Sequence, residues 1–245
     1  MINPIHKVLS TMQDYQVQCL LMGGQACILY GGAEFSRDVD FVVLASGGNM
    51  VRLRQALAEL EARVVAVPPF DEQHLRHGHA VHFRCAHPEA SDLRIDVMSV
   101  LRGLDPFDIL WERRTSVELG SGLTADLLAL PDLVKAKKTQ RDKDWPMIRR
   151  LVEADYARSQ PQSGEKQILF WLRECRTPSM LMELAKFYPQ QVVKVVSMRP
   201  LLALARAGNE SGLERALMAE ELEERQADRN YWQPLRRELE TLRHV

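Results

Sequence analysis

The sequence predicts an α+β protein, in which a mixed sheet with flanking helices is followed by an α-helical C-terminal domain. Up to about residue 100, short apolar runs of strand length alternate with helical patterns. From about Pro131 onward nearly every segment has helical spacing, and no internal repeat interrupts this order. With 245 residues, 46% of them hydrophobic, the chain is long enough to bury a substantial core.

The N-terminal elements follow one another closely. A short helical pattern covers 8–15, and the apolar run "VQCLLM" predicts a buried strand. "QACILYGG" predicts a short helix closed by glycines, and "DVDFVVLA" a second strand. "GGNMVRLRQALAELEAR" has helical spacing, with Asn49 as its expected cap. "VVAVP" predicts a further strand, and "HAVHFRCAH" and "LRIDVMSVL" predict an antiparallel pair.

The C-terminal part is predicted to be helical. "PDLVKAKKTQRDKDWPMIRRLVEADY" indicates two helices, the second beginning near Trp145, because proline is tolerated in a first turn. A polar linker with proline and glycine covers 158–166. The helices expected after it are 165–176, 178–188, 190–197, 199–207, 210–227 and 231–243. We therefore expect two domains, 1–157 and 158–245.

Composition limits the function classes. The net charge of −1 gives no general attraction to nucleic acid, so any basic surface must be local. The four cysteines lack Cys-x-x-Cys spacing, which favours a reducing compartment. The chain has no uncharged apolar run approaching ~18 residues, the length that a membrane span needs. We expect a soluble cytoplasmic protein without a membrane partner.

Three aspartates carry the chemistry that the sequence suggests. Asp38 and Asp40 alternate with apolar residues at the start of a strand, which places both on one face. Asp96, in "LRIDVMSV", alternates with apolar residues in the same way. Such a cluster would lose charge unless a cation joined it, and hard divalent ions prefer oxygen ligands. Gly23 and Gly24, before a short helix, would let the backbone approach a phosphate.

The combined pattern resembles a known family. A glycine pair, a short helix, Asp-x-Asp and a later aspartate on a neighbouring strand are similar to the nucleotidyltransferase superfamily with the polymerase-beta-like fold. The resemblance is to its minimal members and to its abortive-infection and toxin–antitoxin members, and it covers roughly 20–152. It implies a nucleotidyltransferase-fold mixed sheet and an enzyme that moves an NMP group from an NTP, such as ATP, to an acceptor hydroxyl.

The resemblance also implies roles for individual residues. Asp38 and Asp40 would bind Mg²⁺, with Mn²⁺ as an alternative ion, and Asp96 would complete a second metal site and help to deprotonate the acceptor. Gly23 and Gly24 would hold the triphosphate through backbone amides. Many relatives carry Gly-Ser here, so this Gly-Gly pair contributes backbone only. Arg37 would touch a phosphate.

A basic segment extends this resemblance. "DLVKAKKTQRDKDWPMIRRL" is similar to the family's later motif, a helix lysine followed by Arg-x-Lys-Asp. Its basic run "KAKKTQRDK" contains the nucleotide-binding candidates Lys137, Lys138 and Arg141. Lys137 fits when residues are counted from Asp132, but counting back from Arg141 makes Lys138 nearly as good. The segment would neutralise phosphates, or it would form a solvated helix face.

Two further alternatives stay open. Five histidines lie within residues 74–87, and their spacings suit either a transition-metal site or a solvated loop beside the Asp96 strand. The fold also admits a catalytically inactive nucleotide-binding or interaction protein. For the active enzyme, the expected partners are an NTP, an RNA acceptor, tRNA in particular, and an antitoxin protein.

Overall fold

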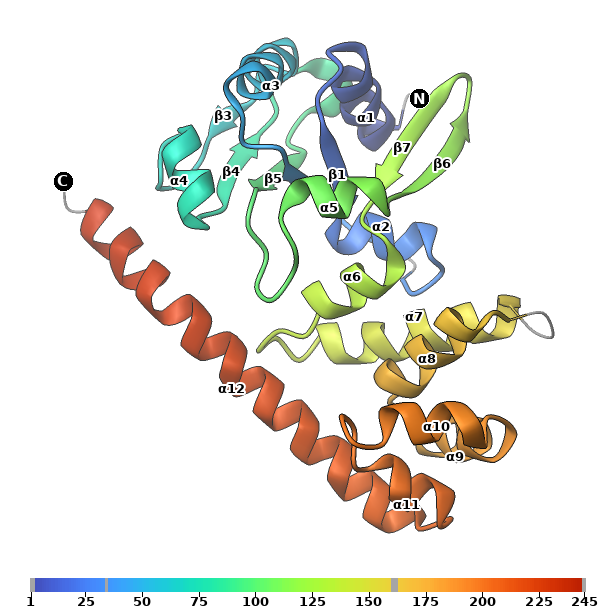
Figure 1. Cartoon of the computed structure of the whole chain (residues 1–245). Coiled ribbons are helices and arrows are strands. Elements are labelled where there is room, and N and C mark those ends of the chain that lie inside the picture. Colours follow the sequence, from blue (N-terminus) through green and yellow to red (C-terminus); the bar gives the residue numbers. More distant parts are fainter. Residues whose placement is uncertain (1–2, 34, 160–162, 244–245) are drawn as a thin grey trace. The chain divides into compact units, whose positions relative to one another are not determined.

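The computed structural model describes residues 3–33, 35–159 and 163–243. Contacts within the chain divide it into two compact units. The first unit comprises Met1–Leu29, Glu34–Ala136 and Tyr231–Val245, and the second comprises Tyr30–Ala33 and Lys137–Asn230. The first unit contains a mixed sheet and the second is helical, so the predicted α+β class is confirmed (Figure 1).

The sheet of the first unit has seven strands in the order β3-β4-β5-β2-β1-β7-β6. Two pairs, β2 with β5 and β1 with β7, are parallel, and the other neighbours are antiparallel. The predicted antiparallel pair of the strands that contain His82 and Asp96 is confirmed as β4 and β5. The strands are β1 Cys19–Met22, β2 Asp38–Val43, β3 Arg63–Val64, β4 Val81–Arg84, β5 Arg94–Met98, β6 Thr115–Gly120 and β7 Leu123–Leu127.

Among the described residues, seven helical segments lie wholly within the first unit, around this sheet. Figure 1 shows α1 and α3 side by side on one side of the sheet, and residues of α1 line a small cavity together with Leu21 and Phe41. Because side chains alternate along a strand, Met22 and Asp40, the neighbours of those two residues, face the opposite side. The segments are α1 Pro4–Asp14, α2 Gly23–Leu29, α3 Gly47–Glu59, α4 Glu72–His77, the 3₁₀ turn η1 Pro88–Ala90, α5 Phe107–Glu112 and α6 Leu130–Ala136.

Asn49 does not cap helix α3, contrary to the sequence-based expectation. The cap position belongs to Ser46, and Asn49 lies fully buried inside the helix. Its side chain accepts a hydrogen bond from the Gln18 amide at 2.8 Å and donates to the carbonyls of Gln18 and Leu44 at 3.0 and 2.9 Å. Asn49 therefore joins α3 to the chain before β1 and after β2.

The second unit packs short helices around an apolar centre that includes Trp171, Leu181 and Val192. The indole of Trp171 donates to Asp155 of α7 at 2.8 Å, which ties α8 to α7. This contact division groups α7 with the later helices, whereas the sequence analysis placed residues up to 157 in the N-terminal domain. The helices are α7 Asp144–Ser159, α8 Glu165–Glu174, α9 Pro178–Phe187, α10 Pro189–Val195 and α11 Leu202–Arg206.

The last helix, α12, is continuous from Glu210 to Leu242, where the sequence predicts two helices. The prediction leaves residues 228–230 between two helices, but charged and amide side chains such as theirs are tolerated in a helix. Asp228 is buried, and its carboxylate accepts a hydrogen bond from the Gln140 amide at 2.9 Å. Pro234 lies inside the helix and donates no hydrogen bond to the Asn230 carbonyl. The boundary between the two compact units falls within this helix, directly after Asn230.

Across the described residues, the structure contains no helix with the length and apolar character that crossing a bilayer requires.

Candidate functional site

The structure brings the three predicted aspartates to one face of the sheet. β2 and β5 are parallel neighbours, and Asp40 lies directly opposite Asp96 in their register. Asp38 precedes Asp40 by two residues and therefore shares its face. Val39, between Asp38 and Asp40, and Ile95 and Val97, on either side of Asp96, face the other side of the sheet and are fully buried. The alternation that predicted a common carboxylate face is thus present in the fold.

Gly23 packs directly against this face. It begins α2 immediately after β1, and its φ of +65° is one that residues with a side chain rarely adopt. A Cβ atom at this position would lie 1.8 Å from Oδ2 of Asp40. Both the backbone angle and the available space therefore require glycine beside the Asp40 carboxylate.

Gly24 has a related but different constraint. A Cβ atom here would lie 2.3 Å from the Ser36 hydroxyl oxygen, in the segment that enters β2. That hydroxyl donates a hydrogen bond to the Asp38 carbonyl at 3.2 Å, and the side-chain amide of Gln25 donates one to the Ser36 carbonyl at 3.1 Å. The glycine pair thus allows the start of α2 to pack closely against the chain that carries Asp38.

Asp96 has two cationic or polar neighbours that the sequence analysis did not assign. The Arg94 Nε atom donates to Oδ1 of Asp96 at 2.7 Å, and His82 Nδ1 lies 2.9 Å from the same oxygen. Burial opposes ionisation of Asp96, but the hydrogen bonds from His82 and Arg94 outweigh it and lower the carboxyl pKa. Asp96 is therefore a stably ionised and weakly basic group.

Arg94 also interacts electrostatically with the other two aspartates. Its Cα position lies opposite Asp38 in the β2–β5 register, and its exposed fraction is 39%. Asp96 raises the Arg94 pKa most, burial opposes this, and the charges of Asp38 and Asp40 contribute further. The signal was present in the sequence, because the Arg94-x-Asp96 spacing places both side chains on one face.

The donor set of this face suits a hard divalent cation. Mg²⁺ typically binds one or two protein carboxylates together with substrate phosphates, so Asp38 and Asp40 provide the right type of oxygen ligand. Among the described residues, only one group of three His, Cys, Asp or Glu ligand atoms lies within a mutual 4.8 Å, and it does not include these aspartates. The carboxylates are therefore aligned without converging into a three-ligand cage.

Arg37 lies directly before the start of β2. It is exposed, precedes Asp38 directly, and its guanidinium carbon lies 5.7 Å from the centre of the Phe35 ring. Phe35 is itself 71% exposed. Arg37 is therefore open to solvent next to the first aspartate.

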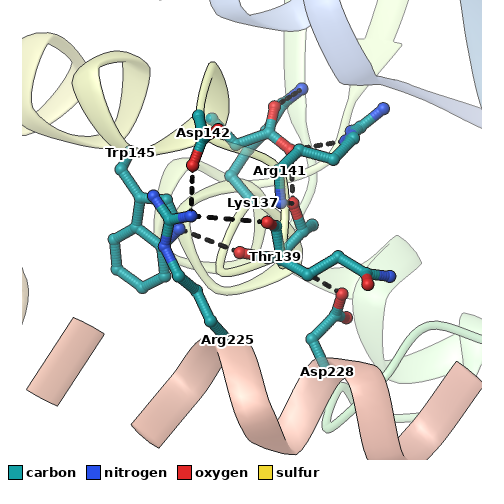
Figure 2. Close-up of polar contacts among 9 residues, drawn as sticks. Lys137, Thr139, Arg141, Asp142, Trp145, Arg225 and Asp228 are labelled. Carbon is teal, nitrogen blue, oxygen red and sulfur yellow. Dashed lines mark hydrogen bonds and ion pairs between the residues drawn. The ribbon is translucent and has the colours of Figure 1, made fainter. Parts of the chain in front are cut away.

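Lys137 and Arg141, two predicted nucleotide-binding residues, belong to the second unit, and both form ion pairs there (Figure 2). Lys137 is buried with its Nζ atom 3.3 Å from Asp144 Oδ1, and Arg141 Nε lies 2.8 Å from Asp144 Oδ2. The Thr139 hydroxyl donates to the same carboxylate at 2.6 Å. Burial opposes ionisation of Asp144, but Lys137 and Arg141 outweigh it and lower its pKa.

Lys138, the third candidate of the basic segment, is also paired within the second unit. Its Nζ atom lies 2.8 Å from Glu174 and 3.7 Å from Glu224. The basic segment therefore has the carboxylate partners Asp144, Glu174 and Glu224, none of which the sequence analysis assigned, although Asp144 lies within the motif that it quoted. Asp144 is the last residue of the Arg-x-Lys-Asp motif, at the start of α7.

The histidine-rich segment separates into different environments. His82 contacts Asp96, as described above, and His87 caps η1 by accepting a hydrogen bond from the Glu89 amide at 3.1 Å. His77 and His79 instead contact Glu238, near the C-terminal end of α12. The histidines of this segment therefore contact three different partners in the first unit: Asp96, the start of η1 and Glu238.

Three of the four cysteines have raised pKa values. Burial raises the pKa of Cys19 to about 12, and the charge of Asp126 adds to this shift. Burial likewise raises the pKa of Cys85 and of Cys175 to about 11. Thiols with such pKa values are protonated at neutral pH, so these three side chains are poor nucleophiles.

No protein-family model matches this chain, and no curated protein sequence compared with it matches either.

Proposed function

We propose that this chain is a Mg²⁺-dependent nucleotidyltransferase with a polymerase-beta-like nucleotidyltransferase fold in its first unit. The observation that carries the proposal is the packing of Gly23 against Asp40, directly beside the aligned Asp96. A backbone segment with no room for a side chain, next to paired carboxylates, suits a triphosphate and its cation. The packing supports this function over a purely structural acidic cluster, which would not require glycine there.

In this proposal Asp38 and Asp40 hold Mg²⁺ or Mn²⁺. Such an ion, when bound, polarises the α-phosphate and stabilises charge on the leaving group. The backbone of Gly23 and Gly24 binds the triphosphate, and exposed Arg37 contacts a phosphate oxygen.

Asp96 orients the attacking hydroxyl by accepting its hydrogen bond. The hydroxyl oxygen forms a bond to the α-phosphorus, the bond from that phosphorus to the bridging oxygen breaks, and pyrophosphate leaves. Because its pKa is lowered, Asp96 is a weak base and takes the hydroxyl proton only as the new bond forms.

The acceptor that we favour is an RNA end, and tRNA in particular, as the resemblance to toxin-type nucleotidyltransferases implies. An antitoxin protein is the corresponding proposed partner. The net charge of −1 requires that RNA binding use local cations rather than the field of the whole molecule. Arg37 and Arg94 are the local cations that flank the aspartates.

A second candidate, a nucleotide-binding or interaction protein without turnover, is favoured by one specific contact. The Arg94 guanidinium already neutralises Asp96, which is the role that a second metal ion would otherwise have. If this ion pair persists with nucleotide bound, Asp96 does not serve the acceptor hydroxyl. The two candidates therefore differ in the role of Arg94, which either helps to hold anionic substrate or blocks Asp96.

The test uses the full chain with each α-labelled NTP, total RNA and Mg²⁺, followed by identification of the labelled species. The active enzyme should yield labelled RNA, and Asp38→Asn should abolish it, while Asp14→Asn, an exposed carboxylate on α1, should leave the yield unchanged. Absence of product with all four nucleotides, together with Mg²⁺–NTP binding that Asp38→Asn does not weaken, would refute the proposal.

Arg94→Gln separates the two candidates. In an active enzyme Arg94 helps to hold anionic substrate at the site, so the variant should lose transfer activity and bind NTP more weakly. In the inactive protein the arginine blocks Asp96, so its removal should leave NTP binding intact or improve Mg²⁺ binding. Calorimetric titration with Mg²⁺ and a non-hydrolysable NTP measures both quantities.

A further inference from the structure

A second group of ligand-type side chains lies in the first unit, on residues that the proposed transfer reaction does not use. Helix α4 ends at His77, and Gly78 caps it with a left-handed φ of +102°. The Gly78 amide hydrogen-bonds the His74 and Leu75 carbonyls, and this reversal places His79 directly beside His77. The two imidazole rings have centroids 5.5 Å apart.

Both rings turn the same atom toward one carboxylate. The Nε2 atoms of His77 and His79 each lie 2.9 Å from Oε2 of Glu238, on the last turns of α12. One ligand atom from each of the three residues lies within 4.8 Å of the others. Two zinc ligands at about 2.0–2.1 Å and a tetrahedral angle are about 3.3–3.4 Å apart. Separating each nitrogen from the carboxylate oxygen by about 0.4–0.5 Å would therefore admit an ion.

His79 is the most buried of the three residues. Its side chain is only 2% exposed, and its Nδ1 atom has no hydrogen-bond partner among the described residues. The other ring nitrogen, Nε2, contacts Glu238, and a bound ion would replace this contact. His77 and Glu238 are more exposed, at 58% and 44%, so an ion can reach the group from solvent.

The group also lines a cavity. This cavity has a volume of about 610 Å³ and includes Gln73, His74 and Arg76 in its wall, together with the three ligand residues. The His74 ring lies with its centroid 5.9 Å from that of His79. A metal held by three protein atoms here would keep its fourth position open toward this space.

We propose that His77, His79 and Glu238 form a binding site for a divalent first-row transition-metal ion, with Zn²⁺ as the preferred ion. Two imidazole nitrogens and one carboxylate oxygen are a donor set typical of zinc sites with an open fourth position. The same set disfavours Mg²⁺, which requires oxygen ligands in near-octahedral geometry. The site is separate in residues from the carboxylate face and does not depend on the proposed transferase activity.

The alternative is that the two histidines only hydrogen-bond Glu238 and dock the end of α12 against α4. Titration of the metal-free full chain with Co²⁺ distinguishes these cases, because four-coordinate Co²⁺ gives intense visible absorption bands. We expect one ion per chain, displacement by Zn²⁺, and no displacement by excess Mg²⁺.

Three variants test the ligand assignment. His77→Ala and Glu238→Gln change exposed side chains, so circular dichroism should show that both remain folded. Each should weaken Co²⁺ binding by at least about tenfold, the lower limit seen even for losing a hydrogen-bond partner of a metal ligand. His6→Ala, which removes an exposed histidine on α1, is the matched control and should bind like the unmodified chain. A wild-type chain that binds no Co²⁺, or binding that is equal in all variants, would overturn the proposal.

Discussion

Replacing Gly23 by alanine tests the packing on which the proposed catalytic face depends. The added methyl group would lie 1.8 Å from Asp40 Oδ2, and the residue would keep a φ of +65°. The left-handed angle alone costs about 1–2 kcal/mol for a residue with a side chain. Displacing the Asp40 carboxylate adds about 1–3 kcal/mol, as is typical of overpacking. We therefore expect the free energy of unfolding to fall by about 2–5 kcal/mol.

Two other glycines separate these contributions. Gly122, in the β6–β7 turn, has a φ of +77°, and a Cβ atom added there would have no neighbour within 4 Å, so Gly122→Ala should show the backbone cost alone. A Cβ atom at Gly24 would lie 2.3 Å from the Ser36 hydroxyl oxygen and 2.6 Å from Ser36 Cβ, without a positive φ, so Gly24→Ala should show the cost of a close contact alone. Urea unfolding followed by circular dichroism gives the free energies, and hydrogen exchange in β1 and β2 localises the change.

A double-mutant cycle measures the coupling free energy between Gly23 and Asp40. Combining Gly23→Ala with Asp40→Ala removes the clashing carboxylate, so the pair should be less destabilised than the sum of the single variants by about 1–3 kcal/mol. The reasoning is wrong if Gly23→Ala costs no more than Gly122→Ala, or if the cycle shows no coupling. Either outcome would mean that Gly23 is an ordinary turn glycine.

Three further predictions concern single side chains. Asp38→Asn should abolish nucleotidyl transfer while changing the free energy of unfolding by less than about 0.5 kcal/mol, since the group is partly exposed; a large loss of stability would make Asp38 structural. Asp144→Asn should destabilise the second unit by about 3 kcal/mol at pH 7, because it leaves Lys137 buried without a carboxylate; urea unfolding that matches wild type would contradict this. Because the Asp144 pKa is lowered on folding, its contribution is complete above the unfolded value near 3.9 and is lost as pH falls further, so the variant should show a flatter stability profile in acid. Asn49→Ala should cost about 1–3 kcal/mol, because the Gln18 amide loses its partner while the Gln18 and Leu44 carbonyls each keep one backbone hydrogen bond. Thermal unfolding equal to wild type would refute that.

The sequence was most informative where periodicity and burial agree. The strands β1, β2 and β5 lie in predicted runs, β1 in a continuous apolar run and β2 and β5 in runs that alternate. The same alternation placed Asp38 and Asp40 on one face, because the side-chain period of a strand is fixed at two. The position of Asp96 beside them depended on its strand pairing alongside, which the register of β2 and β5 provides.

Other elements depended on contacts between distant residues, which a local pattern does not contain. The β6–β7 hairpin was not predicted, since alternate residues of β6 are exposed and the run is weakly apolar. Its signal was the turn Gly120-Ser121-Gly122, in which all three residues have positive φ. Asn49 has the residue type of a helix cap, and only the approach of β1 to α3 makes its buried position favourable.

The cation beside Asp96 shows why a catalytic site is harder to predict than a fold. A cluster of carboxylates requires positive charge, and the sequence analysis assigned that charge to metal ions. The structure supplies part of it through Arg94, two residues before Asp96 on the same strand face. Alternation predicts that Arg94 and Asp96 share a face, but it does not distinguish an arginine that substitutes for a metal from one that binds a phosphate. Asp96 both hydrogen-bonds Arg94 and attracts its charge, whereas Asp38 and Asp40 raise the Arg94 pKa through their charges. The charges of Asp38 and Asp40 therefore already stabilise the Arg94 guanidinium, and a divalent ion bound to them would compete with Arg94 for these carboxylates.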